Sequence, residues 1–375
     1  MVRRHPDRFE LVALAAHRSV VELCAQVAEF RPRRAIVADA DAFAGAGELP
    51  AAAWASGRDA LLEVVQDEGV DVVVNALVGF AGLEPTLAAL GAGKRLALAN
   101  KESLVAGGPL VIDAATRGGG SLVPIDSEHS AILQCIAEAD RATVARIVLT
   151  ASGGPFRGWN PGALDGVRPS DALRHPTWEM GAKITIDSAT LANKALEVIE
   201  AHFLYGIAYS NIDVVVHPQS IVHSFVEFVD GSVLAQMGFP TMELPILYAL
   251  SHPGRVDDVR LRTFDPLRCS PLTFEAVDHR IFPLFELGVE AGRAGGTAPA
   301  VFNAANEVAV EAFLKSGLPF PAMAGVVESA LAGHSRRAVG DVGDVLEADR
   351  EARAAALRAV ERAGSVTRAA SGAQA

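Results

Sequence analysis

Residues 70–103 read VDVVVNALVGFAGLEPTLAALGAGKRLALANKES, and this stretch indicates the fold class of the first third of the chain. It opens with a continuous apolar run, VDVVVNAL, which is typical of a buried strand. The segment LEPTLAALGAG has helical spacing and stops at Gly91 and Gly93, and KRLALAN then has the pattern of a second strand. A strand, a helix and a strand in this order predict a βαβ unit with parallel strands.

The same alternation continues on both sides of this stretch. Upstream, ELVALAA (10–16) and RAIVAD (34–39) are predicted strands, SVVELCAQVAEF is a helix capped by Ser19, and DALLEVVQDEG is a helix ending at Gly69. Downstream, SLVPI is a short strand. Residues 1–125 are therefore predicted to form an α/β domain with a parallel sheet, whose binding residues lie at the carboxyl ends of the strands. The polar groups at these ends are His17-Arg18, Asn75 and Asn100-Lys101-Glu102-Ser103.

The pattern changes at about residue 126. Residues 126–251 contain longer strands, and an Asp230-Gly231 pair between apolar runs predicts a hairpin, so this part is expected to be an α+β domain. Residues 252–277 have little periodicity and are expected to form a linker. Residues 278–362 have helical spacing and are expected to form a C-terminal helical domain, while the small, polar tail 363–375 is expected to be disordered.

Composition excludes several classes of protein. The chain has 375 residues and a net charge of -12, from 33 basic and 45 acidic residues, which disfavours nucleic acid and anionic membranes as partners but permits a small anionic ligand. No apolar run is long enough to span a bilayer. The three cysteines are far apart and match no metal or disulfide spacing, which favours a reducing, cytoplasmic location.

The first candidate site is Asp126-Ser127-Glu128-His129, directly after the strand SLVPI. Two carboxylates two positions apart at a strand end can converge on one hard cation such as Mg²⁺ or Mn²⁺. An alternative interpretation is an acidic loop that caps the following helix, SAILQCI.

The second candidate site is KITIDSATLANKALEVIEAHF, in which Asp187 or Ser188 is expected to cap a helix. Asn193, Lys194 and Glu197 then share one face, because they stand at positions i, i+1 and i+4. That face is either a solvated helix surface with an intrahelical ion pair, or a site where Glu197 binds a metal and its two neighbours bind an anionic substrate.

Two loops lie between these segments. ARIVLTASGGPFRG places Ser152 and two glycines after a strand, where backbone N–H groups and a hydroxyl can approach a phosphate, although any tight turn has the same composition. LRHPTWEMGAKI places His175, Trp178 and Met180 on a segment bounded by Pro and Gly, which either packs on the core or closes over a ligand.

The first domain lacks the strand-GxGxxG-helix pattern that binds dinucleotides. Arg18 nevertheless follows a predicted strand at the place where a basic residue accepts the 2′-phosphate of NADP. An NAD-dependent hydroxy-acid dehydrogenase would explain the alternating first domain, but not the acidic and phosphate-binding residues.

Taken together, these segments resemble the 1-deoxy-D-xylulose 5-phosphate reductoisomerase family of the non-mevalonate isoprenoid pathway. The resemblance extends from about residue 9 to past residue 315. The matching blocks, in family order, are LANKESLV, PIDSEHSAI, TASGGPFR, RHPTWEMGAKITIDSATLANKALEVIEA, HPQSIVHS, GSVLAQMG and FNAANEVAVEAFL.

The resemblance implies a fold and a set of roles. It implies a Rossmann-like NADPH-binding domain, a catalytic and connective domain that forms a homodimer, and a C-terminal helical domain. The implied metal ligands are Asp126, Glu128 and Glu197, and the catalytic residues are Lys101, Glu128 and Glu197. The implied substrate contacts are Lys101, Ser127, Glu128, Ser152, His175, Ser188, Asn193, Lys194 and Glu197. The implied cofactor contacts are His17, Arg18, Ser19, Asn100, Glu102 and Gly181, and the implied mobile flap contains Trp178 and Met180.

One departure from the family pattern affects the cofactor site. The family begins with a strand and a GxTGSIG loop that binds the cofactor pyrophosphate, and this sequence starts after that point, so its sheet is expected to lack a central strand. The resemblance implies NADPH- and metal-dependent conversion of the sugar phosphate 1-deoxy-D-xylulose 5-phosphate to 2-C-methyl-D-erythritol 4-phosphate, with Mg²⁺, Mn²⁺ or Co²⁺. The alternative is a protein that binds sugar phosphate and metal without reductase activity.

Overall fold

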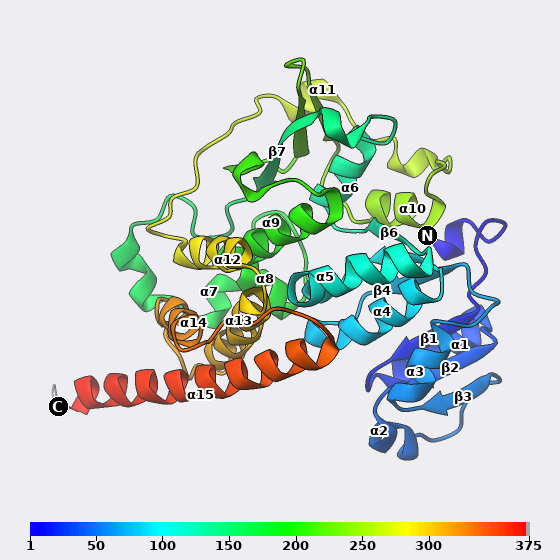
Figure 1. The fold of residues 1–375 in the computed structure, drawn as a ribbon, viewed down its shortest axis with the longest axis horizontal. Coiled ribbons are helices and arrows are strands. Elements are labelled where there is room, and N and C mark those ends of the chain that lie inside the picture. The colour runs from blue at the N-terminus through cyan, green and yellow to red at the C-terminus, as the bar shows by residue number, and fades with distance from the viewer. Residues whose placement is uncertain (373–375) are drawn as a thin grey trace.

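The computed structural model describes the backbone of residues 1–372 and the side chains of residues 1–364. Its first part contains two three-stranded parallel sheets, with strand orders β1-β2-β3 and β4-β5-β6. The strands are β1 (Ala13–Ala16), β2 (Arg34–Val37), β3 (Ala53–Ser56), β4 (Val72–Asn75), β5 (Arg95–Leu98) and β6 (Ser121–Pro124). The predicted parallel α/β arrangement is confirmed, and the sheet is divided in two between β1 and β4 (Figure 1).

The helices of this part follow the strands. They are α1 (Val20–Phe30), α2 (Ala40–Ala44), α3 (Arg58–Val64), α4 (Leu83–Gly91) and α5 (Lys101–Gly118), with 3₁₀ turns η1 (Val2–Arg4) and η2 (Gly79–Gly82). The helix predicted to end at Gly69 ends five residues earlier, at Val64. Strand β3 was not predicted from the sequence.

The first sheet has a small core of its own. Leu23 and Val27 of α1 pack on Ala35 and Val37 of β2. β1–β3 and their helices form a lobe around this small core, seen at the lower right of Figure 1, and Ile36 of β2 and Val64 of α3 join it to the main core.

The middle part is built on a four-stranded mixed sheet with the order β10-β9-β7-β8. Its strands are β7 (Val144–Ala151), β8 (Ile212–Val216), β9 (Val222–Phe228) and β10 (Val233–Met237). The hairpin predicted at Asp230-Gly231 is confirmed, because β9 and β10 pair antiparallel around it. Helices α6 (Ser127–Cys135) and α9 (Ala192–Tyr205) pack against this sheet.

The remaining elements of the middle part are short. They are η3 (Arg141–Thr143), η4 (Pro161–Gly166), α7 (Pro169–Ala172), α8 (Ala182–Ala189), η5 (Tyr209–Asn211), α10 (Glu243–Ser251), η6 (Val259–Leu261) and α11 (Pro266–Cys269). The segment after α11 is held to the sheet, since the backbones of Val216 and Glu275 form a bridge.

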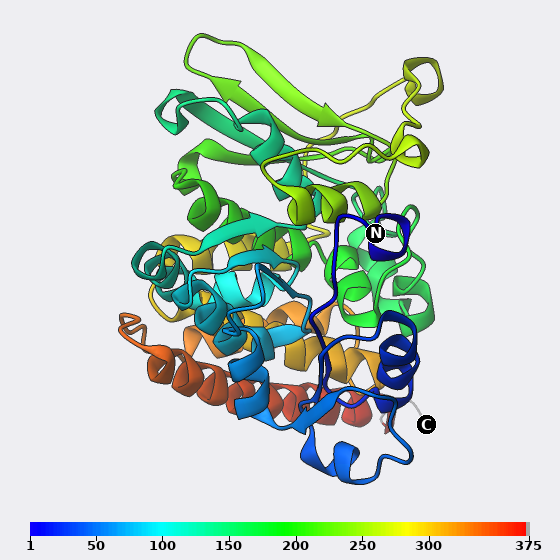
Figure 2. The same cartoon turned by 90° about the vertical axis from the view of Figure 1, so that its right-hand side faces the viewer.

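The last part is helical, as predicted. It contains α12 (Pro283–Ala294), α13 (Ala298–Leu314), α14 (Ala322–Ala332) and α15 (Val342–Gly372). Helix α13 is buried on nearly all sides, packing against α5, α12, α14 and α15. Helix α15 extends along the base of the molecule (Figures 1 and 2) and continues into the tail expected to be disordered, whose residues 373–375 lie outside the described part of the chain.

Candidate active site

The parallel strands β5 and β6 place two charged residues side by side. Lys101 begins α5 directly after β5, and Asp126 caps α6 after β6. Because adjacent parallel strands end at the same edge of a sheet, the Lys101 ammonium lies 2.8 Å from Asp126 Oδ2. Asp126 also accepts a hydrogen bond from the backbone N–H of Glu128 at 3.3 Å, so the capping interpretation of this segment is confirmed, and its role as a metal site stays a prediction.

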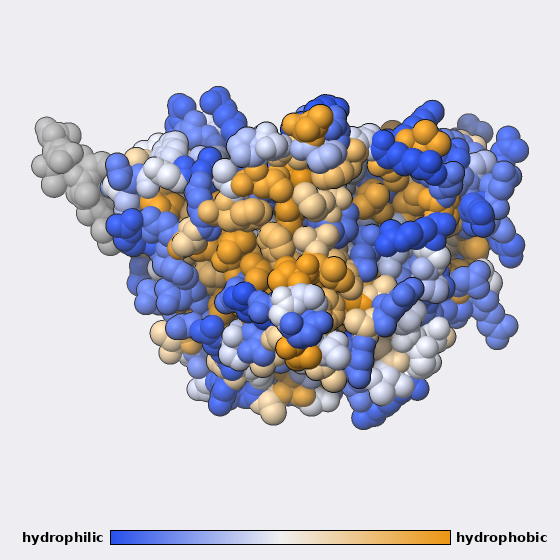
Figure 3. Space-filling model, turned by 90° about the horizontal axis from the view of Figure 1, so that it is seen from above, coloured by the Kyte–Doolittle hydropathy of each residue, from blue (hydrophilic) through white to orange (hydrophobic). Residues whose placement is uncertain are grey.

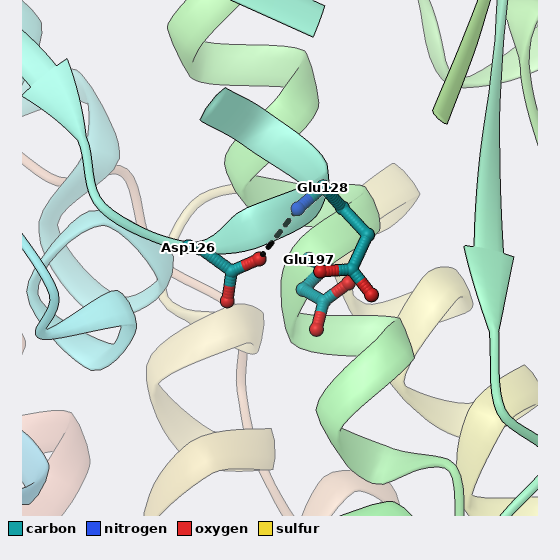
Figure 4. A group of neighbouring side chains, drawn as sticks. All are labelled: Asp126, Glu128 and Glu197. Carbon is teal, nitrogen blue, oxygen red and sulfur yellow. Dashed lines mark hydrogen bonds between the residues drawn. The ribbon is translucent and has the colours of Figure 1, made fainter. Parts of the chain in front are cut away.

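Helix α9 adds the third carboxylate. Ligand oxygens of Asp126, Glu128 and Glu197 all lie within 4.8 Å of one another, and Figure 4 shows the three carboxyl groups turned toward one common volume. Glu197 is 1% exposed and Lys194 is 3% exposed. The interpretation of this helix face as a solvated surface is therefore wrong, because α9 is buried against the sheet and against α5, α8 and α12.

Two lysines compensate the three negative charges. Lys194 Nζ lies 2.7 Å from Glu128 Oε1 and also contacts Glu197 Oε2. Lys101 Nζ lies 3.3 Å from Glu197 Oε1 and donates a 2.6 Å hydrogen bond to the side-chain oxygen of Asn193. Buried charges are stable only when paired in this way.

The carboxylates differ in their affinity for protons. Burial, together with the charges of Asp126 and Glu128, raises the pKa of Glu197 to about 7. Burial alone would raise the pKa of Asp126 as well, but Lys101, His129 and Lys194 outweigh it and bring this pKa below its usual value. Of these two carboxyl groups, Glu197 is therefore the one that binds a proton near neutral pH.

The start of α9 differs from the sequence prediction. Asp187 and Ser188 were expected to cap one helix, but both lie inside α8, and α9 begins after Leu191. Leu191 has a left-handed backbone, φ 56°, which separates the two helices. Asp187 is unavailable as a cap because its carboxylate contacts Lys183 and Asn306.

The glycine loop after β7 packs against the end of α8. Gly154 has φ +63°, and a Cβ there would lie 2.8 Å from the backbone oxygen of Ser188. A glycine at this position therefore allows the loop to approach α8 closely, which brings Ser152 and Ser188 to the same cavity.

His175 connects this loop to the predicted flap. Its Nδ1 accepts hydrogen bonds from the backbone N–H groups of Thr177 at 3.1 Å and Trp178 at 2.8 Å. Burial lowers the pKa of His175, and a neutral ring whose Nδ1 accepts carries its proton on Nε2. Nε2 therefore donates to Ser152 Oγ at 3.0 Å. Gly154 N–H also donates to this oxygen at 3.3 Å, which leaves the hydroxyl proton of Ser152 for a ligand.

A cavity of about 280 Å³ unites these groups. The sequence-predicted residues that line it are Lys101, Asp126, Ser127, Glu128, Ser152, His175, Trp178, Met180, Ser188, Asn193, Lys194 and Glu197. The lining also includes residues that had no role in the sequence analysis, among them Leu191, Ser220, His223 and Met242. Ser220 and His223 both belong to HPQSIVHS, one of the blocks that carry the family resemblance, and this was the available signal for them.

The predicted cofactor residues lie outside this lining. His17, Arg18 and Ser19 follow β1 in the separate lobe, where Arg18 Nε contacts Asp39 Oδ2 at 2.6 Å. Asn100 and Glu102 are buried at the start of α5, and Gly181 precedes α8. Their roles as cofactor contacts stay predictions.

Comparison with known proteins identifies the family. A family model described as 1-deoxy-D-xylulose 5-phosphate reductoisomerase matches residues 1–108, and two models of its C-terminal domains match residues 122–205 and 237–355. The enzyme of that name from Burkholderia mallei (strain SAVP1) is 48% identical over 365 residues, covering 95% of this chain and 91% of its own. The chain belongs to the 1-deoxy-D-xylulose 5-phosphate reductoisomerase family.

Solved structures of this family have the same fold. The 1-deoxy-D-xylulose 5-phosphate reductoisomerase from Zymomonas mobilis in complex with NADPH has 42% sequence identity and a TM-score of 0.87, covering 96% of this chain and 94% of its own. A DOX-P reductoisomerase in complex with NADPH, fosmidomycin and magnesium has 39% identity, the same coverage and a TM-score of 0.89. The three-part fold expected for this family is thus confirmed. Among the described residues, the structure contains no helix with the length and apolar character that a membrane span requires.

Proposed function

We propose that this member of the reductoisomerase family converts 1-deoxy-D-xylulose 5-phosphate to 2-C-methyl-D-erythritol 4-phosphate, using NADPH and a divalent metal ion. The observation that carries the proposal is the convergence of Asp126, Glu128 and Glu197 in a cavity that also contains Ser152 and His175. A carboxylate triad beside a group of hydroxyl, amide and ammonium donors suits a substrate with oxygens to chelate and a phosphate to hold.

The triad fits the expected metal. Three carboxylates within 4.8 Å form an all-oxygen donor set, which suits Mg²⁺ or Mn²⁺, with Co²⁺ a further candidate. When bound, the ion supplies Lewis acidity toward a carbonyl and a neighbouring hydroxyl of the substrate.

Lys101 and Asn193 orient the reacting end of the substrate. Lys101 is fixed by Asp126 and Asn193, so its ammonium is held at the edge of the triad. A buried ammonium at this place stabilises negative charge that develops on a substrate oxygen during the isomerisation. Ser127, which donates a 2.5 Å hydrogen bond to Glu128, lies beside the same oxygens.

The phosphate is held at the other end of the cavity. We assign its contacts to Ser152, His175 and Ser188, whereas Asn193 and Lys194 hold the substrate beside the triad. Ser152 has a hydroxyl proton to donate, because its oxygen already accepts from His175 and Gly154. Binding energy from the phosphate then favours closure of the flap that carries Trp178 and Met180, and closure excludes water.

Residues for the cofactor are available in the first part of the chain. Arg18 has a side chain that is 70% exposed at the end of β1, and its contact to Asp39 is made through Nε, which leaves its terminal N–H groups to bind a 2′-phosphate. His17, Ser19, Asn100 and Glu102, together with Gly181 from the middle part, complete the proposed set. When bound, NADPH supplies the hydride that reduces the rearranged aldehyde.

We also propose that the protein is a cytoplasmic homodimer. One face of the sheet β10-β9-β7-β8 packs on α6 and α9, whereas apolar residues are exposed around the hairpin at its edge and on the segment beside β8. These residues are Val229, Val233, Leu234, Met237 and Phe274. Figure 3 shows an extended apolar surface on this side of the molecule, and a second copy would cover it. The three cysteines are free, which suits a reducing compartment.

Turnover with the natural substrate tests the function. The purified chain should oxidise NADPH when 1-deoxy-D-xylulose 5-phosphate and Mg²⁺ are both present. This oxidation should stop when the metal is chelated. Glu197→Gln keeps the size of the side chain and removes a metal ligand, so kcat should fall by about a thousandfold or more while the circular dichroism spectrum is retained. Retained turnover in this variant would contradict the assigned metal site, and binding of substrate without any NADPH oxidation by wild type would favour the binding-only alternative.

A further inference from the structure

Lys183 lies at the junction of three helices and outside the lining of the active-site cavity. Its ammonium is 2.7 Å from Glu102 Oε1 on α5 and 2.8 Å from Asp187 Oδ2 on its own helix, α8. Asp187 is in turn fixed to α13, because Asn306 Nδ2 donates a 2.7 Å hydrogen bond to its other carboxylate oxygen. A continuous polar chain therefore connects α5, α8 and α13.

The two carboxylates of this polar network are buried, and its lysine is largely buried. The side chains of Glu102 and Asp187 are 8% and 1% exposed, and that of Lys183 is 20% exposed. Burial alone would raise the pKa of Glu102, but Lys183 brings it below its usual value. Since unpaired charges are costly in such an environment, the positions of the two carboxylates depend on the one ammonium between them.

The two ends of α8 carry residues assigned to different ligands. Gly181, before its first turn, is a proposed cofactor contact and also joins the flap to the helix. Ser188, in its last turn, lines the substrate cavity. The N-terminal end of α8 has no side-chain cap. The ion pair between Lys183 and Glu102 links this end of the helix to the start of α5.

We propose that Lys183 is a positioning residue. It sets α8 against the start of α5, so that the cofactor and the sugar phosphate are held in the correct position relative to each other. The inference rests on the proposed function, because it takes Glu102 and Gly181 as cofactor contacts and Ser188 as a substrate contact. We assign Lys183 no contact with either ligand, because it lies outside the lining of the substrate cavity. Its effect passes through Glu102 on one side and Asp187 on the other.

Substitution of Lys183 tests the proposal. Lys183→Met keeps the aliphatic stem and removes the charge, so both carboxylates lose their shared partner. The dissociation constant for NADPH and the KM for the sugar phosphate should each rise by about tenfold, the effect of losing one charge-assisted contact, with a smaller change in kcat. Lys183→Arg should restore most of the NADPH affinity, since it retains the charge.

Arg337 provides a matched control. It is also a partly buried cation with two carboxylate partners, Glu351 at 2.9 Å and Glu347 at 3.6 Å, but it lies beside α15. Arg337→Met should lower the melting temperature without changing NADPH affinity. If Lys183→Met lowers the melting temperature by a similar amount and leaves both binding constants within about twofold of wild type, Lys183 is only a structural ion pair and the proposal is wrong.

A second variant covers the case in which Lys183→Met does not fold. Asp187→Asn retains the shape of the side chain and weakens the same link from the α8 side, so KM for the sugar phosphate should rise, and an unchanged KM would overturn the proposal. These outcomes are distinct from failure of the proposed function, in which wild type itself would not oxidise NADPH with this substrate.

Discussion

Lys194 on α9 donates a 2.7 Å hydrogen bond to the carboxylate of Glu128 on α6. The same ammonium contacts Glu197 on its own helix, so one lysine bridges two of the three carboxylates that we assign to the metal. The triad is thus held together in part by this lysine. Its geometry is set by helix packing and by lysine charges that reduce the repulsion between the carboxylates.

Metal affinity should depend on pH. The pKa of Glu197 is raised to about 7, and a metal must displace its proton. We therefore expect the dissociation constant for Mg²⁺ to rise by about tenfold per unit as pH falls below about 7, and to level off above about 8. Isothermal titration calorimetry between about pH 5 and pH 9 measures this dissociation constant. A constant that does not change with pH would contradict the assignment of Glu197 as a metal ligand.

The stability of the metal-free protein should have the opposite dependence. Glu197 binds its proton more tightly in the folded state than in the unfolded state, so its contribution to stability is present at low pH and is lost as pH rises through about 7. Relative to Glu197→Gln, which has no proton to lose, the metal-free wild type should lose ~1–3 kcal/mol between about pH 5 and pH 8. Urea unfolding at each pH measures the difference, and parallel curves for the two proteins would count against a raised pKa.

His175 should affect the KM for the sugar phosphate more than kcat. Its Nδ1 holds the flap backbone at Thr177 and Trp178 while its Nε2 faces Ser152. His175→Gln retains an amide donor but not both contacts together, so KM should rise about tenfold, corresponding to one or two hydrogen bonds. Steady-state kinetics with inorganic phosphate as a competitor measures this, and the inhibition constant for phosphate should weaken in parallel. An unchanged inhibition constant would exclude the assigned phosphate contact.

Gly154 should tolerate substitution less well than Gly158, which has a similar backbone conformation. Gly154→Ala combines a positive φ of +63° with a Cβ that would lie 2.8 Å from Ser188 O, whereas Gly158 has φ +76° and open space around it. Gly158→Ala should cost ~1 kcal/mol and Gly154→Ala ~2–4 kcal/mol of unfolding free energy. Gly154→Ala should also raise KM for the substrate, because Ser152 and Ser188 move apart. Equal costs in the two variants would show that the close approach to α8 is unimportant.

The exposed apolar residues around the β9–β10 hairpin should set the oligomeric state. Leu234 on β10 is 49% exposed in a single copy, and an aspartate there would place a charge in the proposed dimer contact. Light scattering should show a dimer for wild type and a monomer for Leu234→Asp. Val21→Asp, on exposed α1 in the separate lobe, should leave the dimer intact. A monomeric wild type would contradict this part of the proposal.

Most of the fold could be predicted from the sequence because the local sequence signals were strong. The apolar runs at β4 and β5 and the Asp230-Gly231 turn each predict one element without knowledge of the rest of the chain. Strand β3 has the sequence AWAS, too short and too weakly apolar for its pattern to be recognised. The break at Leu191 was missed because leucine favours helices, and its left-handed backbone is imposed by tertiary packing.

The site was predictable only in part. Asp126 and Glu128 are close in sequence, so spacing alone suggested that they act together. The spacing of Asn193, Lys194 and Glu197 indicated a shared face, but not whether that face was buried, because burial depends on α5, α8, α12 and the sheet packing over it. The link from Lys183 to Glu102 has no sequence signature, since the two residues meet only through the packing of α8 near the start of α5.

Anomalous diffraction from crystals of the protein grown with Mn²⁺ tests the central claim most directly. We predict a single strong manganese peak within coordination distance of one oxygen each from Asp126, Glu128 and Glu197, and the loss of that peak in Glu197→Gln. A peak elsewhere, or a triad that holds no ion at millimolar Mn²⁺ and neutral pH, would contradict the account.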